Sequence, residues 1–520
     1  MAAGICILVI GIFYFAYFPV NYDFDGTVFG HFLRYALMKN DLTLVHQPQH
    51  PLYIPVNYVS YKWLKNLFGY SVLEYYHLQL FSFIFGLLTL WVCYKIVKRL
   101  TENRMFQWLG MGGIAGTYAF WYYTVEAEVH MPGIFFVTAG MYLLFFQPQD
   151  RGFRNDLTRM IFASLCLVLA AGFHLTNGLI AVSVLLIFIV EKRPFRKIAL
   201  FFACYTFFFL AGLYAFYLLS RINLPAFYQN QLQGNDALAG YKISYWNHWT
   251  PAAVWESIQA TANAILFPAS SFWSIVNVIL LLTAVSVIVY AVSRCVPADF
   301  RINATRFGLW MMPYFLFFTF WDHRNTEFKL NVILPFWILL ISTLAVVSRG
   351  TKKRLVPLSV VLLVSFIGIF NFYAYMKPAS QLENNANYLA AEAIRKVTPP
   401  ESVIVIAGSG PGVSMYNKIY LPYFAMRQTL ILDWMLGKGF SLARIRSRIE
   451  DEIAKGVPVY LFSDALPAGD ALKHMLKNHR IDVSDYFEFI RQLNLNGRIP
   501  LRNNDYLLFR EKVGKKLLVK

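Results

Sequence analysis

Long apolar blocks separated by short polar segments dominate the first 376 residues. Most blocks are about as long as a bilayer is thick, roughly 17–25 helical residues. They predict a mainly α-helical, polytopic transmembrane bundle of about 11 helices, with the short blocks near Met160 and Leu175 broken or re-entrant. The blocks run approximately Gly4–Val20, Leu78–Tyr94, Phe106–Tyr123, His130–Phe146, Met160–Phe173, Leu175–Val190, Ile198–Leu219, Phe272–Val292, Phe307–Trp321, Leu330–Val347 and Leu355–Tyr375.

The remainder of the chain, residues 377–520, has a different pattern and contains no block long enough to span a membrane. Short apolar runs at Ser402–Ala407 and Pro458–Phe462 are typical of strands, and helical patterns cover Leu382–Val397 and Ser441–Lys455. Alternation of strands and helices predicts a small α/β fold. We therefore expect two domains, a membrane domain at 1–376 and a soluble domain at 377–520.

Residues 21–74 form a long polar segment after the first apolar block. Two stretches within it repeat apolar residues at helical spacing, which predicts amphipathic helices lying on the membrane. The first carries Phe29, Phe32, Leu33, Ala36 and Leu37, and the second carries Val56, Val59, Trp63 and Leu67.

Composition supports the membrane interpretation and changes how the charge is understood. Of the 520 residues, 57% are hydrophobic and only 15% are charged, which is too little polar surface for a soluble protein of this length. The net charge of +18 does not indicate nucleic-acid binding, because the basic residues lie mainly in short loops and form no basic helix.

The basic loops predict the orientation of the bundle. Every second loop is basic, and the positive-inside rule places these loops in the cytoplasm. The N-terminus is then cytoplasmic, while residues 21–74, residues 220–271 and the C-terminal domain are extracytoplasmic. We expect a bacterial plasma membrane. The basic residues are Lys95, Lys98, Arg99, Arg104, Arg151, Arg154, Arg159, Lys192, Arg193, Arg196, Lys197, Arg294, Arg301, Arg306, Arg349, Lys352, Lys353 and Arg354.

Two acidic pairs are candidates for chemistry on the outer side. Asp23 and Asp25 follow the first apolar block, and Glu126 and Glu128 fall in a short turn close to His130. A lone Asp at a helix end is usually only solvated, and a tight polar turn in the headgroup region would also explain the second pair. Carboxylates at membrane depth are costly, however, unless they face a cavity or a partner.

Basic and imidazole groups supply candidates for anion binding. The segment Trp321–Lys329 carries His323, Arg324 and Lys329 on the predicted outer side, where Arg and Lys are able to grip a phosphate. The alternative is a charged loop whose Asp322, Arg324, Glu327 and Lys329 pair with one another. His174 and Asn177 lie between two short apolar blocks, where they line a cavity or mark a membrane interface.

These motifs resemble those of the GT-C superfamily of membrane glycosyltransferases, nearest to its protein O-mannosyltransferase-like branch. The resemblance extends from Gly4 to about Tyr375, and the C-terminal region lies outside it. It rests on the acidic motif Asp23–Gly26, the amphipathic helices, the segment His50–Tyr53, the turn Glu126–His130 and the polar segment Asn325–Lys329.

The resemblance implies a transferase, hexosyl or pentosyl, that uses a polyprenyl-phosphate sugar held by its lipid in the bilayer. One carboxylate would act as general base on an acceptor hydroxyl of a protein, lipid or glycan, and a single displacement would invert the anomeric centre. Cationic groups would stabilise the leaving phosphate. The competing hypothesis is a transporter or flippase for a lipid-linked or anionic solute, although the sequence shows no repeat symmetry.

The resemblance also implies residue roles. Asp25 is the first choice for the base and Asp23 the alternate. Glu126 and Glu128 would orient the acceptor or hold a divalent cation, if one is used; no other cofactor is indicated. The candidates for binding the donor phosphate are His50, His130, Arg324 and Lys329.

Overall fold

The structure is a computed structural model of the chain, and it describes residues 2–42, 49–147, 153–220, 250–294, 296–349, 355–409, 413–466, 470–501 and 505–510. The chain divides into two compact units. The first unit comprises residues 1–19 and 32–380, and the second comprises residues 20–31 and 381–520. The predicted division at residue 376 lies near Ser380, but the structure assigns residues 20–31 to the second unit.

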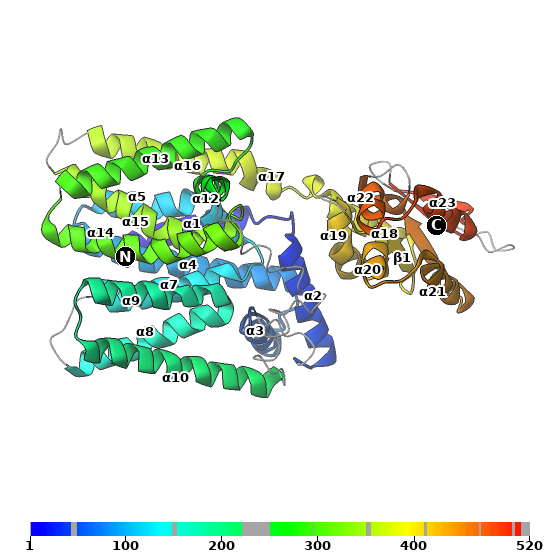
Figure 1. Ribbon diagram of the computed structural model, residues 1–520, viewed down its shortest axis with the longest axis horizontal. Helices are drawn as coiled ribbons and strands as arrows, with labels where there is room; N and C mark the ends of the chain where they lie inside the picture. Colours follow the sequence, from blue (N-terminus) through cyan, green and yellow to red (C-terminus); the bar gives the residue numbers. More distant parts are fainter. Residues whose placement is uncertain are drawn as a thin grey trace. The chain divides into compact units, whose positions relative to one another are not determined.

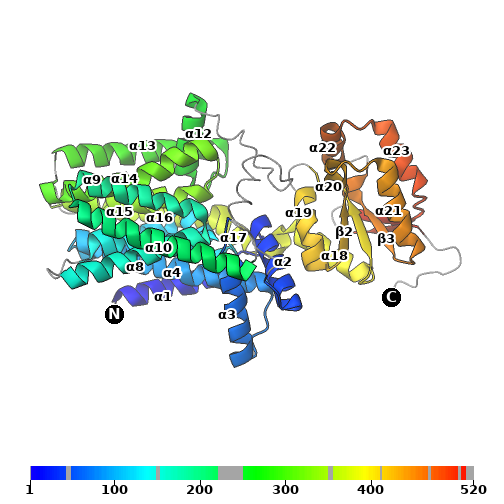
Figure 2. The same cartoon turned by 60° about the horizontal axis from the view of Figure 1, so that its bottom comes forward.

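Helices make up the first unit (Figures 1 and 2). Its elements are α1 (Ala2–Ala16), the second half of α2 (Phe24–Lys39), α3 (Tyr53–Phe68), α4 (Glu74–Leu100), α5 (Arg104–Gly116), α6 (Tyr118–Val125), α7 (His130–Met141), η1 (Tyr142–Phe146), α8 (Phe153–Phe173), η2 (Leu175–Leu179), α9 (Ile180–Val190), α10 (Phe195–Ser220), α12 (Pro251–Asn263), α13 (Ser271–Arg294), α14 (Ala298–Trp321), η4 (Glu327–Lys329), α15 (Leu330–Val347), α16 (Leu355–Asn371), η5 (Phe372–Met376) and α17 (Lys377–Ala379).

Burial differs sharply between the helices of this bundle. Helix α15 is buried along nearly its whole length, and Trp337 and Ile341 belong to one continuous apolar core. By contrast, few side chains of α10 and α16 are buried, and Phe207 and Leu362 are exposed. A helix that is apolar all round is stable in this way either inside a bundle or against lipid. The exposed helices therefore mark the surface that faces the membrane.

In the described part of the chain, six helices are long and apolar enough to cross a membrane. A seventh is added if α6 and the helix His130–Phe146 count as one span, although the two are bent by 117° at the break between them. The apolar helices Ala3–Ala16 and Leu175–Val190 are shorter. The bundle is thus polytopic, while the count of eleven spans stays a prediction.

The second unit contains a five-stranded sheet with helices around it. Besides residues 20–31, its elements are η6 (Leu382–Asn384), α18 (Ala386–Val397), β1 (Val403–Ile406), α19 (Val413–Tyr420), η7 (Leu421–Ala425), β2 (Gln428–Ile431), α20 (Leu432–Gly437), α21 (Leu442–Ala454), β3 (Val459–Phe462), η8 (Ser463–Ala465), α22 (Asp470–His479), α23 (Val483–Gln492), β4 (Gly497–Pro500) and β5 (Tyr506–Phe509).

The sheet has the order β2-β1-β3-β5-β4 and is mixed. Strand β1 pairs in parallel with β2 and β3, and β5 runs antiparallel to β3 and β4. All four residues of β1 and of β3 are buried, which explains why both read as continuous apolar runs. Ile445 and Ile449 of α21, four residues apart, pack into the same core.

Residues 20–31 are fixed within the second unit by aromatic packing and hydrogen bonds. The Tyr22 ring lies 4.9 Å from the Phe424 ring, and the Tyr420 hydroxyl donates a hydrogen bond to the Tyr22 carbonyl oxygen. Asn385 Nδ2 donates to the carbonyl oxygen of Val20 at 2.7 Å. The segment that carries Asp23 and Asp25 is therefore anchored to α18, α19 and η7.

Candidate functional site

Two loops of the first unit are joined backbone to backbone and bring histidines together. The Leu52 N–H donates to the Gly172 carbonyl oxygen at 2.9 Å, and the Leu175 N–H donates to the Gln49 carbonyl oxygen at 3.1 Å. Gly172 lies close to Leu52, and a Cβ atom at this position would lie 2.5 Å from Leu52 Cδ1, so a larger residue would require the Leu52 side chain to shift. The loops that contain His50 and His174 are thereby held side by side.

The third imidazole comes from the start of α7, where the side chain of His130 is buried. Its ring centroid lies 5.0 Å from that of His174, and the His174 centroid lies 4.7 Å from that of His50. His130 Nε2 is 3.6 Å from Glu327 Oε2. His50 and His130, predicted from distant segments of the sequence, thus meet through His174.

Hydrogen bonds define the protonation of two of these rings. His174 Nδ1 accepts from the Thr176 backbone N–H at 3.3 Å, so this nitrogen carries no proton. His50 Nδ1 lies 3.3 Å from the Phe173 carbonyl oxygen, which only accepts, so His50 donates there. Burial and the nearby His130 lower the pKa of His50 to about 3 despite that carbonyl, and burial followed by the other two imidazoles lowers the pKa of His174. Both rings are neutral near pH 7.

Lys329 is a buried cation at the end of η4 with an exposed fraction of 0%. Its Nζ donates to Ser257 Oγ at 2.9 Å, and Ser257 Oγ also lies 2.8 Å from Thr319 Oγ1. Among the described residues no carboxylate lies within ion-pairing distance of this ammonium group. A buried charge requires compensation, and an anion bound beside Lys329 would provide it.

Arg324 belongs to a different arrangement. It forms two hydrogen bonds to Glu256 of α12, from Nε to Oε2 at 3.0 Å and from Nη2 to Oε1 at 2.8 Å. His323 Nε2 is 2.6 Å from Glu256 Oε2. These contacts lower the pKa of Glu256, with the Arg324 hydrogen bond as the largest cause.

The alternative in which the charges of residues 322–329 pair with one another is therefore wrong. The ion-pair or hydrogen-bond partners of Arg324 and Lys329 lie on α12, and the ion-pair partner of Glu327 lies on α7. Neither Glu256 nor Ser257 stood out in the sequence, because each is an isolated polar residue in an otherwise unremarkable helical stretch.

Glu126 and Glu128 lie in the bent connection between α6 and α7. Their exposed fractions are 1% and 4%, so the structure favours buried carboxylates over a solvated headgroup turn. The Tyr75 hydroxyl donates to Glu126 Oε2, and Ser82 Oγ donates to the carbonyl oxygen of Glu128 at 2.8 Å. Both donors come from α4. Burial makes two carboxylates in one turn costly, which is typical of a functional position.

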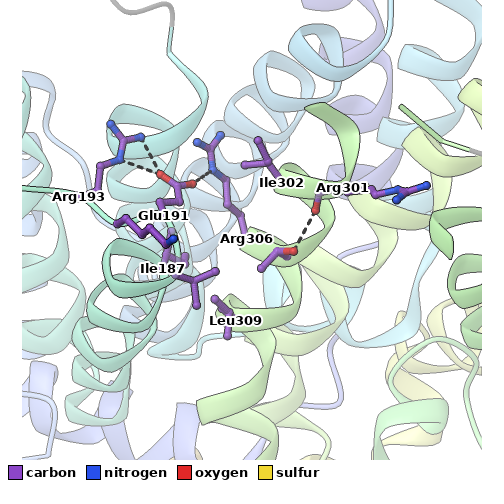
Figure 3. A pocket seen from close by; sticks show the side chains of 10 residues that line it. Ile187, Glu191, Arg193, Arg301, Ile302, Arg306 and Leu309 are labelled. Carbon is purple, nitrogen blue, oxygen red and sulfur yellow. Dashed lines mark hydrogen bonds and ion pairs between the residues drawn. The ribbon is translucent and has the colours of Figure 1, made fainter. Parts of the chain in front are cut away.

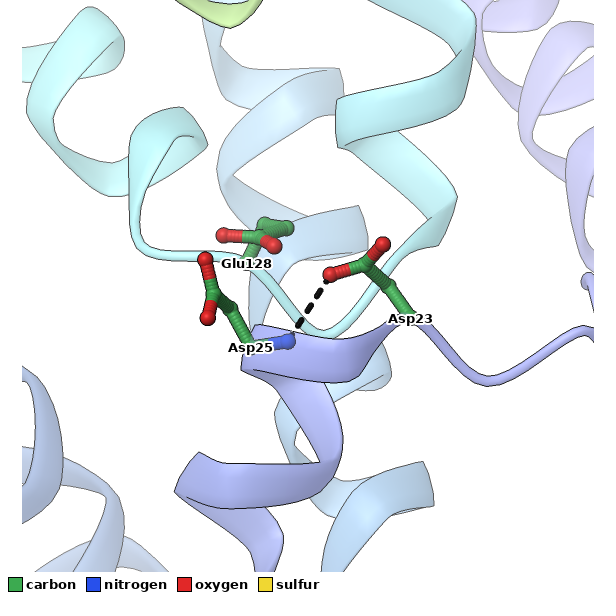
Figure 4. Close-up of side chains that lie close together, drawn as sticks. All are labelled: Asp23, Asp25 and Glu128. Atoms are coloured by element: carbon green, nitrogen blue, oxygen red, sulfur yellow. Dashed lines mark hydrogen bonds between the residues drawn. The ribbon is translucent and has the colours of Figure 1, made fainter. Parts of the chain in front are cut away.

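The structure distinguishes Asp23 from Asp25 within the second unit. Asp23 Oδ2 accepts from the Asp25 backbone N–H at 3.0 Å (Figure 4). The Asp23 carbonyl oxygen accepts from the Thr27 N–H at 3.0 Å. Asp23 thus caps the N-terminus of α2. The Asp25 side chain is exposed in the first turn of that helix. Figure 4 also shows Glu128 in its turn.

The chain shares its fold with the solved structures of ArnT and of an archaeal oligosaccharyltransferase, and it is a multi-pass membrane protein. No family model matches the sequence, and no curated protein matches it. The likeness is therefore one of structure.

Individual solved structures define the likeness. ArnT from Cupriavidus metallidurans in the apo state is 12% identical, with a TM-score of 0.58 over 98% of both chains. The archaeal oligosaccharyltransferase AglB from Archaeoglobus fulgidus, in complex with an inhibitory peptide and a dolichol-phosphate, is 10% identical, with a TM-score of 0.56 over 100% of this chain and 75% of that chain. An apo oligosaccharyltransferase from the same archaeon is 11% identical, with a TM-score of 0.53 over 89% of this chain and 69% of that chain.

Proposed function

We propose that the chain is a glycosyltransferase that moves a sugar from a polyprenyl-phosphate donor to an acceptor hydroxyl at the outer face of the membrane. The fold supports this proposal, because AglB of the same fold is named an oligosaccharyltransferase and was solved with a dolichol-phosphate. Fold alone does not define a reaction, so the proposal has to rest on side chains of this chain.

The main support for the proposal is the burial of the Lys329 ammonium group. A buried ammonium group with no carboxylate partner among the described residues favours an anionic ligand, and the donor has a phosphate. The neutral imidazoles of His50 and His174 are able to hydrogen-bond phosphate oxygens without adding charge. Arg324 is the weaker candidate, since Glu256 already accepts two hydrogen bonds from it.

Asp25 is the proposed general base. It takes the proton of the acceptor hydroxyl as the hydroxyl oxygen bonds to the anomeric carbon, and the bond from that carbon to the phosphate oxygen breaks. Polyprenyl phosphate leaves with the electron pair, and its growing negative charge is stabilised by Lys329. Asp23 is the less favoured base, because its carboxylate already caps α2.

Glu126 and Glu128 are proposed to orient the acceptor or to hold a divalent cation. Carboxylate oxygens suit a hard cation such as Mg²⁺ or Mn²⁺, and such a cation would add positive charge near the reacting groups. Chelation tests this part separately: loss of transfer with EDTA, restored by one divalent cation, is the expected sign of a metal.

Transfer from radiolabelled polyprenyl-phosphate sugars tests the proposal. Purified full-length chain in lipid vesicles would receive each donor together with membrane extract as the acceptor source. We expect Asp25→Asn to lower the transfer rate about 10²- to 10⁴-fold, the usual contribution of a general base. Asp23→Asn should have a smaller effect, because Asn also caps helices well. Asp299→Asn, at the start of α14, is the control with the same charge change.

Either of two outcomes would contradict the proposal. Transfer unchanged in both Asp23→Asn and Asp25→Asn would remove the mechanism. Movement of unreacted donor between the leaflets, without label in any acceptor, would favour the transporter hypothesis instead. Donor binding and thermal unfolding measured on the same preparations distinguish a loss of chemistry from a loss of folding.

A further inference from the structure

A pocket lies between the C-terminal end of α9 and the N-terminal part of α14, next to basic loop residues (Figure 3). Its volume is about 590 Å³. The positive-inside pattern predicts that this end faces the cytoplasm, whereas Arg324 and Lys329 follow the other end of α14. The pocket is therefore not part of the site described above, and its function does not depend on sugar transfer.

Four basic side chains line this pocket against one carboxylate. The basic residues are Lys192, Arg193, Arg301 and Arg306, and the carboxylate is Glu191. Glu191 is 2.7 Å from Arg193 and also pairs with Arg306, as Figure 3 shows. Among the described residues no carboxylate lies within ion-pairing distance of Lys192, which is exposed. The pocket keeps a surplus of positive charge.

The turn that carries three of these residues is held in place by the backbone. Lys192 has a φ of 53°, the left-handed conformation that commonly ends a helix. The Arg193 N–H donates to the Phe188 carbonyl oxygen at 2.9 Å, and the Lys192 N–H donates to that of Ile189 at 3.0 Å. The positions of the cations are thus set by the C-terminus of α9 and not by a loose loop.

The walls of the pocket are apolar. Ile187 and Val190 of α9 face Ile302 and Leu309 of α14. Val190 and Ile302 have exposed fractions of 55% and 48%, so this wall of the pocket is open to the surroundings of the bundle. An apolar wall beneath a cationic rim complements a molecule that has an anionic head and a hydrocarbon tail.

We propose that this pocket binds an anionic phospholipid from the predicted cytoplasmic leaflet. The headgroup phosphate contacts Lys192 and Arg193, and an acyl chain lies along Val190 and Ile302. Glu191 keeps Arg193 and Arg306 in place and prevents their mutual repulsion when no lipid is bound.

Thermal unfolding of the purified full-length chain in detergent tests this site. Phosphatidylglycerol, phosphatidylcholine and inorganic phosphate would be titrated in separate arms. We expect phosphatidylglycerol alone to raise the midpoint of unfolding in a saturable way. The variant Lys192→Gln with Arg193→Gln should weaken its binding roughly tenfold or more, since each basic residue contributes substantially to anionic-lipid attraction.

A matched control exists in the chain. Lys98 and Arg99 form the same Lys-Arg pair, exposed at the end of α4, on the same predicted side of the membrane. Lys98→Gln with Arg99→Gln should leave phosphatidylglycerol binding within about twofold of the unmodified chain, given the short reach of screened charges. Equal weakening by both pairs of substitutions would overturn the proposal, because it would indicate attraction to the whole basic face.

The arms also separate a lipid from a free anion. Equal stabilisation by inorganic phosphate, or by phosphatidylcholine, would overturn the assignment of an anionic lipid. Ile302→Trp fills the apolar side of the pocket without changing its charge and should also weaken phosphatidylglycerol binding. Undiminished binding in this variant and in Lys192→Gln with Arg193→Gln would place the lipid elsewhere.

Discussion

Two basic residues near opposite ends of α14, Arg306 and Lys329, differ in whether a carboxylate pairs with them. Near its start, Arg306 shares Glu191 with Arg193 and also donates to the Phe145 carbonyl oxygen at 2.9 Å. Beyond its end, Lys329 is fully buried, and in the described part of the structure only the Ser257 hydroxyl accepts from its ammonium group. Arg306 has its countercharge within the protein, whereas no carboxylate of the described residues lies within ion-pairing distance of Lys329.

This difference separates Arg306, whose charge is balanced within the protein, from Lys329, whose charge is available for a ligand. Burial would raise the pKa of Glu191, but hydrogen bonds and charge from Arg306 and then Arg193 outweigh burial and lower it. Such a carboxylate stabilises the fold. A buried ammonium group without that compensation destabilises the fold, so its presence needs another explanation.

Lys329→Met is expected to have the largest effect on activity. Removing a cation that stabilises the leaving phosphate should reduce transfer roughly 100- to 1,000-fold, by analogy with the loss of one electrostatic donor. The midpoint of thermal unfolding should stay the same or rise, because Met fills similar space without a buried charge. Normal transfer in a folded Lys329→Met protein would refute the role of this residue.

Glu191→Gln should lower the stability of the fold and leave the rate of sugar transfer unchanged. It leaves Arg193 and Arg306 close together with their carboxylate gone, at a cost of about 1–3 kcal/mol in the free energy of unfolding. Denaturant unfolding measures this loss, and transfer per folded molecule should be unchanged. Because the pKa of Glu191 is lowered in the folded state, its stabilisation is present above its ordinary pKa and is lost as the pH falls through the folded value.

Acidification should lower the thermal stability of the protein, because His50 is buried in its neutral form. Its folded pKa of about 3 lies below the ordinary value near 6.5, so the unfolded chain takes up a proton first as the pH falls. We expect the midpoint of thermal unfolding to decrease between pH 6.5 and pH 5. In the His50→Gln variant this decrease should be smaller. His479→Gln, in the second unit, is the control; an identical pH profile for His50→Gln and the unmodified chain would contradict a buried neutral His50.

Arg324→Gln is expected to have the smallest effect. Its side chain is 75% exposed, and solvent screens its pair with Glu256. The unfolding midpoint should change too little to measure, and transfer should fall much less than in Lys329→Met. A loss as large as that of Lys329→Met would show that Arg324, and not Lys329 alone, meets the donor phosphate.

The sequence was informative where a local run of apolar residues is enough to define a helix or a strand. The apolar blocks gave long helices such as α4 and α15, and the runs around Val403 and Val459 became β1 and β3. It was less informative where a feature depends on packing. The block Phe106–Tyr123 is interrupted by Thr117, which separates α5 from α6. Strands β4 and β5 are only partly buried, and what makes them strands is the pairing of β5 with β3 and of β4 with β5.

By itself the sequence determined that the chain crosses a membrane, because apolar length and loop charge are local properties that water and lipid act upon directly. It also singled out Asp25, Glu128, His130 and Lys329 as unusual residues for their positions. Only the tertiary structure decided which of these groups have partners. His50 meets His174 through a loop contact across more than a hundred residues, and Lys329 finds Ser257 and no carboxylate among the described residues. Such contacts depend on how distant helices pack, and no local pattern records that packing.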